Sequence, residues 1–321
     1  MLHVTNGDCA AQRIRAAGIE GEILPWRDVL HDGPVPAGLP MPELSALRAK
    51  FIAARGWGGV AEAARGFAER DRALAGLHAH DETVLWFEHD LYDQLQLIQV
   101  LDFVATEASP GARLTLVCGA EYLGSSAPER LAERFRERSE VSETEMALAR
   151  EAWAAFRSPD PAAISLLTGE DTAALPFLAA ALTRHLEQFP SVRNGLSRIE
   201  QQALEAIAAG ADTVRDAYVA AHQRREDPIW LGDASFAWYL EDLAAGETPL
   251  VTIDRNGETD DRDAVLSARV ASTDAGRAVL EGREDRVRLN GIDRWLGGAH
   301  LQGREVGWRW DTEAGRLVTA H

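Results

Sequence analysis

The sequence predicts an α/β fold, with a Rossmann-like parallel sheet in the N-terminal domain, a helical connector and a winged-helix-like C-terminal domain. Two observations lead to this prediction. In the N-terminal part, short strand-like segments alternate with segments whose apolar residues recur at helical spacing. In the C-terminal part, three helical patterns precede two strand-like segments. The expected domains are residues 1–126, 127–190 and 191–321, the last ending in a β-hairpin.

Four strands are expected in the N-terminal domain, and each leads directly into a loop. They are Leu2–Thr5, Glu22–Leu24, Thr83–Phe87 and Leu114–Cys118. The helical patterns between them are Ala10–Ala17, an insertion with Leu44, Leu47, Phe51 and Ile52 at helical spacing, Val60–Leu77, and Leu91–Val104. Strand–helix–strand units form parallel sheets with right-handed crossovers, and ligands bind such sheets beyond the carboxyl ends of the strands. The loops that follow the strands are therefore expected to meet at one edge of the sheet.

The loop after the third expected strand is crowded with titratable groups, in the stretch WFEHDLYDQ. Its candidates for catalytic residues are Glu88, His89, Asp90 and Asp93. Carboxylates and imidazole transfer protons near neutral pH, and they also bind divalent ions. A second interpretation stays open for two of them: Asp90 caps the helix that begins at Leu91, and Asp93 complements its dipole.

The neighbouring loops carry polar residues of their own. The ligand-binding candidates are Asn6, Gly7, Asp8, Arg27, Asp28, Tyr92 and Gln94, and the metal-ligand candidates are His31 and Asp32. Gly7 would let the backbone approach a ligand closely. The stretch TNGD matches neither the dinucleotide-binding nor the P-loop pattern, so Asp8 is expected to cap the helix that starts near Cys9. We expect at least one residue from each loop to reach a common pocket.

Three motifs in this half of the chain together resemble a bacterial family known as a domain of unknown function. They are HVTNGD (His3–Asp8), LPWRDVLHDGPVP (Leu24–Pro36) and WFEHDLYDQLQLIQVLD (Trp86–Asp102). The resemblance covers the first third to half of the chain. It implies no particular reaction, substrate or catalytic residue, so the expected site is inferred from the residues themselves.

The connector is expected to be helical from Pro128 to Phe189, with a capping box at Ser142-x-x-Glu145. A second capping box, Ser197-x-x-Glu200, opens the C-terminal domain. The expected elements that follow this box are a first helix through Ile207, helices Thr213–His222 and Asp233–Ala244, strands Thr248–Asp254 and Val265–Ser272, helix Thr273–Gly282, and a hairpin in Arg288–Asp311 with its turn near Gln302-Gly303.

Three helices followed by a two-stranded wing resemble winged-helix domains, and Gly195–Ile207 is similar to the opening of the helix-turn-helix region of sigma-type transcription factors. Charge argues against DNA as the partner. The whole chain has a net charge of −18, and residues 197–321 contain 15 Arg against 23 Asp and Glu. The expected third helix, Asp233–Ala244, has three acidic residues and no Lys or Arg. A structural or protein-contact role is therefore favoured over DNA binding.

The best local candidates for a contact to an anion or a nucleic acid lie in the C-terminal tail. The candidates there are Arg294, His300, Arg304 and Arg309. In the alternative interpretation, which we favour, the tryptophans of the tail close the C-terminal core and the arginines stack over them. A hairpin that folds back over the N-terminal loops would also complete the expected site.

These observations favour a nucleotide- or small-molecule-directed enzyme, a metal-assisted hydrolase or phosphoryl-transfer enzyme that uses a divalent metal, with its site at the carboxyl edge of the N-terminal sheet. The alternative is a noncatalytic, transcription-associated regulator that binds DNA or a protein partner through the winged helix. No apolar stretch approaches the roughly 20 residues that a membrane helix needs, and the N-terminus lacks the order of a signal peptide. The expected location is the cytoplasm, with no membrane partner, and Cys9 and Cys118 are expected to have no chemical role.

Overall fold

The computed structural model of the protein describes residues 1–107, 113–255 and 262–319. The chain divides into two compact units: the first comprises Met1–Thr183 together with Gly297–Ala299, and the second comprises the remainder. Residues 127–183, which belong to the expected connector, are thus part of the first unit. No helix in the described part of the chain has the length and apolar character that crossing a bilayer requires.

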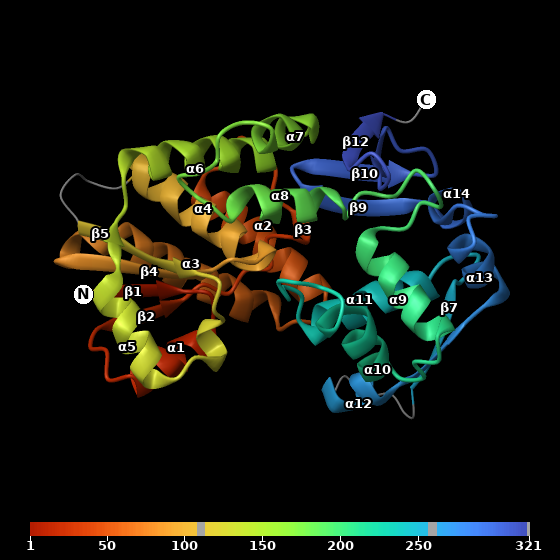
Figure 1. Ribbon diagram of the computed structural model, residues 1–321, viewed down its shortest axis with the longest axis horizontal. Helices are drawn as coiled ribbons and strands as arrows, with labels where there is room; N and C mark the ends of the chain where they lie inside the picture. The colour runs from red at the N-terminus through yellow and green to blue at the C-terminus, as the bar shows by residue number, and fades with distance from the viewer. Residues whose placement is uncertain (108–112, 256–261, 320–321) are drawn as a thin grey trace. The chain divides into compact units, whose positions relative to one another are not determined.

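A five-stranded sheet forms the centre of the first unit, in the order β2-β1-β4-β5-β6 (Figure 1). Its strands are β1 (Leu2–Thr5), β2 (Glu22–Pro25), β4 (Glu82–Glu88), β5 (Arg113–Gly119) and the short β6 (Ser139–Glu140). The first four are parallel, and β6 pairs antiparallel with β5. The expectation of four parallel strands is confirmed. Every residue of β1 and β4 is buried, as expected for the central strands of a sheet covered on both faces.

Helices cover both faces of this sheet. Those of the first unit are α1 (Asp8–Ala16), α2 (Met41–Ala54), α3 (Val60–Ala75), α4 (Leu91–Glu107), α5 (Pro128–Glu137), α6 (Glu143–Phe156) and α7 (Ala162–Thr168), and α8 (Leu178–Leu186) spans the division between the units. Helices α1 and α5 lie below the sheet in Figure 1, and α4 lies above it with α6 packed outside. The expected capping box is present at the start of α6, where the Ser142 side chain accepts from the N–H of Glu145.

Two short 3₁₀ turns and one short strand complete the first unit. Leu77–Ala79 precedes β4, Leu123–Ser125 follows β5, and the two-residue strand β3 is Gly33–Pro34. The turn at Leu123 is part of the core, because Leu123 packs with Val84 and Trp86 of β4. The loop after β5 is thereby held close to the carboxyl end of β4.

The second unit begins with helices and continues with an antiparallel strand pair. Its elements up to residue 290 are α9 (Arg198–Ala208), α10 (Val214–Tyr218) with a π-helical continuation (Val219–Gln223), α11 (Asp233–Ala244), β7 (Val251–Asp254), α12 (Arg262–Ser267), β8 (Arg269–Ser272), α13 (Asp274–Leu280) and α14 (Arg286–Asn290). The expected strand Val265–Ser272 is wrong in its first half, which lies in α12. Pairing with the four residues of β7 limits β8 to four residues, and the burial of Leu266 favours the helical turn.

The tail forms two hairpins where one was expected. Its strands are β9 (Ile292–Gly297) beside β10 (Ala299–Gly303), and β11 (Trp308–Asp311) antiparallel to β12 (Arg316–Thr319). The predicted turn near Gln302-Gly303 is wrong, because the first hairpin turns at Gly297-Gly298 and Gly303 ends β10. The backbone of Gly297 has φ of 62°, a left-handed conformation that glycine adopts without steric cost.

Candidate functional site

The residues at the carboxyl end of β4 connect that strand to α4. Glu88 is the last residue of β4, and α4 begins at Leu91. The Asp90 side chain accepts a hydrogen bond of 3.0 Å from the N–H of Asp93, which confirms the capping interpretation for Asp90. The Asp93 side chain turns back and accepts a hydrogen bond of 2.6 Å from the N–H of Glu88. These two hydrogen bonds fold the connection between β4 and α4 so that the carboxyl groups of Glu88, Asp90 and Asp93 lie close together.

Glu88, Asp90 and Asp93 form a carboxylate cluster in which one oxygen from each residue lies within 4.8 Å of the other two. The three residues are 5%, 4% and 1% exposed, respectively. In the described ranges, this is the one group of three or more His, Cys, Asp and Glu residues that is close enough to hold a metal ion. The cluster contains three of the four catalytic candidates that the sequence predicted.

Loops from the neighbouring strands complete the cluster. The Asn6 amide, after β1, donates a hydrogen bond of 2.8 Å to Asp93, and the N–H of Leu123, after β5, donates one of 2.7 Å to Glu88. The Gln94 amide donates a hydrogen bond of 2.7 Å to the carbonyl of Glu88. The loops after β1, β4 and β5 therefore meet at this edge of the sheet, as expected from its parallel topology.

Burial raises the pKa values of all three carboxyl groups, and repulsion by neighbouring carboxylates adds to this for Asp90 and Asp93. Desolvation is the largest cause for each, because a charged carboxylate loses its hydration on burial. The pKa of Asp90 rises to about 7, with a further contribution from the charge of Glu88. The pKa of Asp93 rises well above its ordinary value through burial and the charges of Asp90 and Glu88. Three negative charges at this spacing are unstable together unless a cation or protons neutralise them.

The donor set fits a hard divalent cation. Mg²⁺ and Ca²⁺ bind oxygen ligands, and carboxylates are the principal ones that proteins supply. The cluster offers three carboxylates in a buried place where their attraction for a cation is little screened. Without a metal, the same groups can hold shared protons, and a pKa of Asp90 of about 7 suits general acid–base work.

His89, the fourth catalytic candidate, is not part of the cluster and lies against two aromatic rings. Its ring lies 5.4 Å from the ring of Tyr122 and 5.8 Å from the ring of Phe177. The ligand-binding candidate Tyr92 extends toward the second loop, where its ring lies 5.9 Å from that of His31. Burial raises the pKa of Tyr92, so its hydroxyl group stays neutral at physiological pH.

The second loop is held by buried ion pairs. Arg48 donates hydrogen bonds of 3.0 Å and 2.8 Å to one oxygen of Asp28, and Arg70 lies 3.6 Å from the other. Asp32 lies 3.5 Å from Arg55. In the part of the chain that the structure describes, neither His31 nor Asp32 belongs to a group of three potential metal ligands. The charges of this loop are thus engaged in holding α2 and α3, which carry the three arginines.

The remaining candidates lie at the start of α1. Gly7 is the N-cap residue, and Asp8 is the first helical residue with no side-chain capping bond, so the expected cap by Asp8 is wrong. Asp8 instead forms an exposed ion pair of 2.6 Å with Arg27. The Asp8 carboxylate therefore bonds to Arg27 of the second loop and not to the N–H groups at the start of α1. A ligand-binding role for Gly7, Asp8 and Arg27 stays a prediction.

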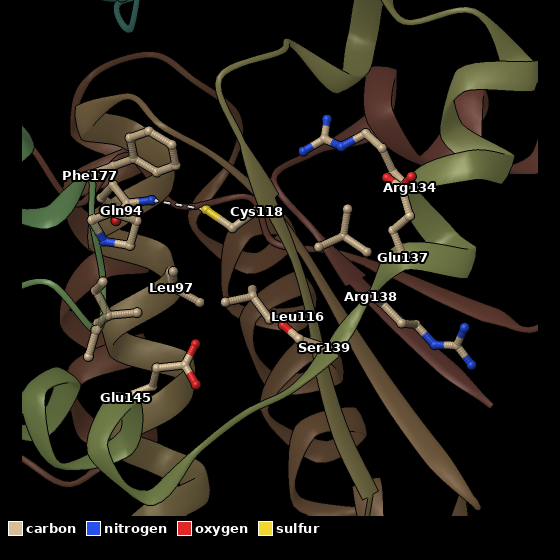
Figure 2. Close-up of a pocket in the computed structure, with 14 residues that line it drawn as sticks. Gln94, Leu97, Leu116, Cys118, Arg134, Glu137, Arg138, Ser139, Glu145 and Phe177 are labelled. Carbon is tan, nitrogen blue, oxygen red and sulfur yellow. Dashed lines mark hydrogen bonds between the residues drawn. The ribbon is translucent and has the colours of Figure 1, made fainter.

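A cavity of about 290 Å³ lies between α4, β5 and α5 (Figure 2). Its polar wall includes Gln94, Cys118 and Arg134, and its apolar wall includes Leu97 and Phe177. The amide of Gln94, which also bonds the Glu88 carbonyl, lies 3.6 Å from the sulfur of Cys118. Burial raises the pKa of Cys118 to about 12, so the sulfur stays a neutral thiol. Nothing in the sequence pattern marks Arg134 as part of a site, because it lies in an amphipathic helix rich in Arg and Glu.

The cationic candidates of the tail are engaged within the second unit. Arg294 is 3% exposed and donates hydrogen bonds of 2.7 Å to Glu200 and 2.6 Å to Asp242. Arg309 pairs with Asp285 at 2.8 Å, and the ring of His300 stacks on Trp295 at 4.4 Å. These contacts agree with the interpretation in which the tail closes the core.

The aromatic face of α11 is buried as predicted, since Phe236 and Tyr239 are 0% exposed. Its acidic residues are also paired: Asp233 lies 2.6 Å from Arg262, and Asp242 lies 2.6 Å from Arg294. Both faces of this helix are thus engaged by the second unit itself. For the chain as a whole, no protein-family model and no curated protein gives a match.

Proposed function

We propose that the first unit is a metal-assisted hydrolase or phosphoryl-transfer enzyme that acts on a nucleotide or another small molecule. In this proposal, Glu88, Asp90 and Asp93 hold a divalent cation. The observation that carries it is the cluster itself, three buried carboxyl groups that each bring one oxygen within 4.8 Å of the other two.

The position of the cluster supports a catalytic use. It lies at the carboxyl end of a parallel, Rossmann-like sheet, where such folds bind ligands. A divalent cation polarises a phosphoryl or carbonyl oxygen and lowers the pKa of bound water. The pKa of Asp90 in the metal-free protein is about 7, so binding of the cation would displace its proton and leave the carboxylate as a ligand. His89, facing Tyr122 and Phe177, would contact the organic part of the substrate.

The variant Asp90→Asn tests the metal site with little disturbance of the helix. Asparagine is as good an N-cap residue as aspartate, so the bond to the N–H of Asp93 is retained while one negative charge is removed. The wild-type protein should melt at a higher temperature with Mg²⁺, Mn²⁺ or Ca²⁺, because a ligand of the folded state stabilises it. Asp90→Asn should lose most of this shift, yet melt no lower than wild type without metal.

Glu82→Gln is the matched control, since Glu82 is a buried carboxylate at the opposite end of β4 that pairs with Arg138. It should melt at a lower temperature and keep the full metal-dependent shift. Hydrolysis of nucleoside triphosphates, p-nitrophenyl phosphate and bis-p-nitrophenyl phosphate in the presence of metal is the accompanying activity assay. A metal shift that persists unchanged in Asp90→Asn would refute the assignment of the site.

A different role suits the second unit. The order of α9, α10 and α11 followed by the β7–β8 pair supports a winged-helix-like module. The pairing of the acidic residues on α11 and the burial of its aromatic face favour a packing or protein-contact use over DNA binding. The alternative function, a noncatalytic regulator, rests on this module.

A further inference from the structure

Arg134 of α5 carries a buried positive charge, and burial lowers its pKa although the charges of Glu121 and Glu88 act in the opposite direction. The residue is 6% exposed. Within the described part of the chain, its Nη2 has no hydrogen-bond partner, while Nη1 donates a hydrogen bond of 3.3 Å to the carbonyl of Glu121. A buried donor without a partner is costly and uncommon in folded proteins, so this guanidinium group needs an explanation.

Two other arginines of the same unit, one half-buried and one buried, have their counter-ions in place. Arg138, which lines the same cavity, pairs with Glu82 at 2.7 Å, and Arg48 pairs with Asp28 at 2.8 Å. Arg134 lies one turn before Arg138, the residue that follows α5, and differs from both because its Nη2 has no hydrogen-bond partner among the described residues. A buried guanidinium group with an unused hydrogen-bond donor is a candidate for pairing with an anionic ligand.

The backbone around Arg134 leaves room for the guanidinium group beside the carboxylate cluster. A Cβ atom added at Gly119 would lie 2.8 Å from Nη2, so the absence of a side chain at Gly119 permits this position. Gly119 ends β5 and lies directly opposite Glu88 of β4 in the register of the sheet. Arg134 therefore approaches the same strand end from which the cluster is built.

The cavity that Arg134 lines has the size and chemistry of a small-ligand site. Its volume of about 290 Å³ lies at the lower end of the range for small-molecule pockets. Figure 2 shows Arg134, Cys118 and Phe177 toward one end of it. Leu97, Leu116 and Phe177 supply apolar wall, and Gln94 links the cavity to the cluster through the Glu88 carbonyl.

We infer that Arg134 binds the phosphate group of a small phosphate monoester, whose organic part lies in this cavity against Phe177. The inference rests on the proposed function and deepens it, because the bound ester would present its phosphate beside the metal cluster. A guanidinium group donates two parallel hydrogen bonds to phosphate, which makes arginine well suited to this contact. Glu137 also lines the cavity, but it is exposed, so solvent screens its repulsion of the anion.

The test is calorimetric titration of the full-length protein with phenyl phosphate and with inorganic phosphate, at constant ionic strength, with and without Mg²⁺. Wild type should bind phenyl phosphate more tightly than inorganic phosphate. Arg134→Gln should weaken the binding of phenyl phosphate by about 10- to 100-fold, the range for a lost hydrogen bond to a charged group. Arg136→Gln, the matched control on the exposed side of the same helix, should bind as wild type does.

Two further measurements separate binding from folding. Gly119→Ala should weaken phenyl phosphate binding without any change of charge, because the added methyl group displaces Nη2. Arg134→Gln should melt no lower than wild type in the absence of ligand, since it removes a buried charge whose desolvation outweighs the attraction of Glu121 and Glu88. A large fall in its melting temperature would mean that Arg134 is a structural residue and would overturn the inference.

The outcomes for the anion and the metal are distinguishable. Equal affinity of wild type and Arg134→Gln for phenyl phosphate would overturn the anion site, even if Mg²⁺ binds to the cluster. Equal affinity of wild type for phenyl phosphate and inorganic phosphate would overturn the assignment to a monoester. Binding of phenyl phosphate that depends on Arg134 but occurs without any metal binding would support the anion site and refute the proposed metal-assisted function.

Discussion

Asp90 combines two physical roles in a single side chain. Its carboxyl group caps α4 through the N–H of Asp93, and it also belongs to the carboxylate cluster. The first role favours a negative charge, because the N-terminus of a helix attracts anions. The second disfavours it, because the group is buried beside Glu88. Burial and repulsion prevail, and the resulting pKa of about 7 makes the protonation of the cluster sensitive to pH in the physiological range.

This pKa predicts how the stability of the metal-free protein depends on pH. As pH rises above the ordinary value of 3.8, the unfolded chain loses the Asp90 proton while the folded chain keeps it until about pH 7. The unfolded state then binds fewer protons, so the free energy of unfolding falls across this window, by up to about 4 kcal/mol if Asp90 titrates alone.

Urea denaturation at a series of pH values measures this fall. Asp90→Asn, which has no proton to lose at this position, should show a clearly smaller decrease between pH 4 and 7 than wild type does. Saturating Mg²⁺ should flatten the wild-type curve, because the metal replaces the proton. A wild-type free energy of unfolding that rises across the window would contradict the raised pKa.

Asn6 is the neutral donor to the cluster. Its amide hydrogen bond to Asp93 is lost in Asn6→Ala, and a hydrogen bond to a charged group is worth about 1.5–3 kcal/mol. We expect Asn6→Ala to destabilise the protein by this amount in the presence of saturating Mg²⁺, when Asp93 is ionised. Denaturation with and without metal gives the comparison. The loss should be smaller without metal, because the raised pKa of Asp93 favours its neutral form. An equal loss in both conditions would speak against a charged Asp93 in the metal-bound state.

At the scale of elements, α2 and α3 fasten the loop that follows β2. The two helices pack against each other, and they supply Arg48 and Arg70 to the buried Asp28 carboxylate. Arg48 also donates a hydrogen bond of 2.6 Å to the carbonyl of Asp32. The insertion between β2 and β4, which contains α2 and α3, therefore holds the loop after β2 in one conformation near the candidate site.

Removing Arg48 should show how strongly this insertion holds the loop. Arg48→Met leaves Asp28 buried with only the more distant Arg70, and breaking a buried pair in this way costs about 3–5 kcal/mol. The double variant Arg48→Met with Asp28→Asn should recover part of the loss, because no uncompensated charge remains. Chemical denaturation of wild type, Arg48→Met and the double variant measures their free energies of unfolding. A double variant less stable than Arg48→Met alone would disprove this account.

At the scale of the whole molecule, the two units differ in what their charges do. In the first unit, three carboxyl groups are gathered into one cluster whose nearby cation, Arg134, has no hydrogen-bond partner at Nη2 among the described residues. In the second, buried charges are matched, as in the network of Glu200 and Asp242 with Arg286 and Arg294. Unmatched buried charge is a mark of ligand sites, and its concentration in the first unit supports the assignment of function to that unit.

The pairing of acidic residues with arginines inside the second unit predicts that duplex DNA binds poorly to the full-length protein. The chain has a net charge of −18, and the acidic residues of α11 are held by the arginines of its own unit. Fluorescence anisotropy with labelled duplex DNA at low salt, where electrostatic binding is strongest, should detect no saturable complex. A salt-dependent complex that is weakened by Arg215→Gln or Arg269→Gln, two exposed positions, would favour the regulator instead.

Much of the fold follows from local sequence patterns. Strand–loop–helix order, the capping boxes at Ser142 and Ser197, and the crowding of acids after β4 depend on residues within a few positions of one another. Such short-range signals depend on helix periodicity and on side-chain bonds to the nearest backbone groups, so they can be read from the chain directly. The cap formed by Asp90 is of this kind.

Only the tertiary structure decided which charges meet. The sequence offered Asp28 and Arg27 as similar loop residues, yet Asp28 is buried against Arg48 while Arg27 pairs with Asp8 in solvent. Likewise, Arg294 pairs with Glu200, which lies 94 positions away. These partners are selected by the packing of helices on the sheet, because a buried charge is tolerated only where folding brings a counter-charge to it. The burial of Arg134 is likewise decided by tertiary structure, because the sequence of α5 is rich in Arg and Glu and does not single this residue out. Arg134 becomes buried, and its Nη2 is left without a hydrogen-bond partner among the described residues, only when β5 and its Gly119 lie beside it.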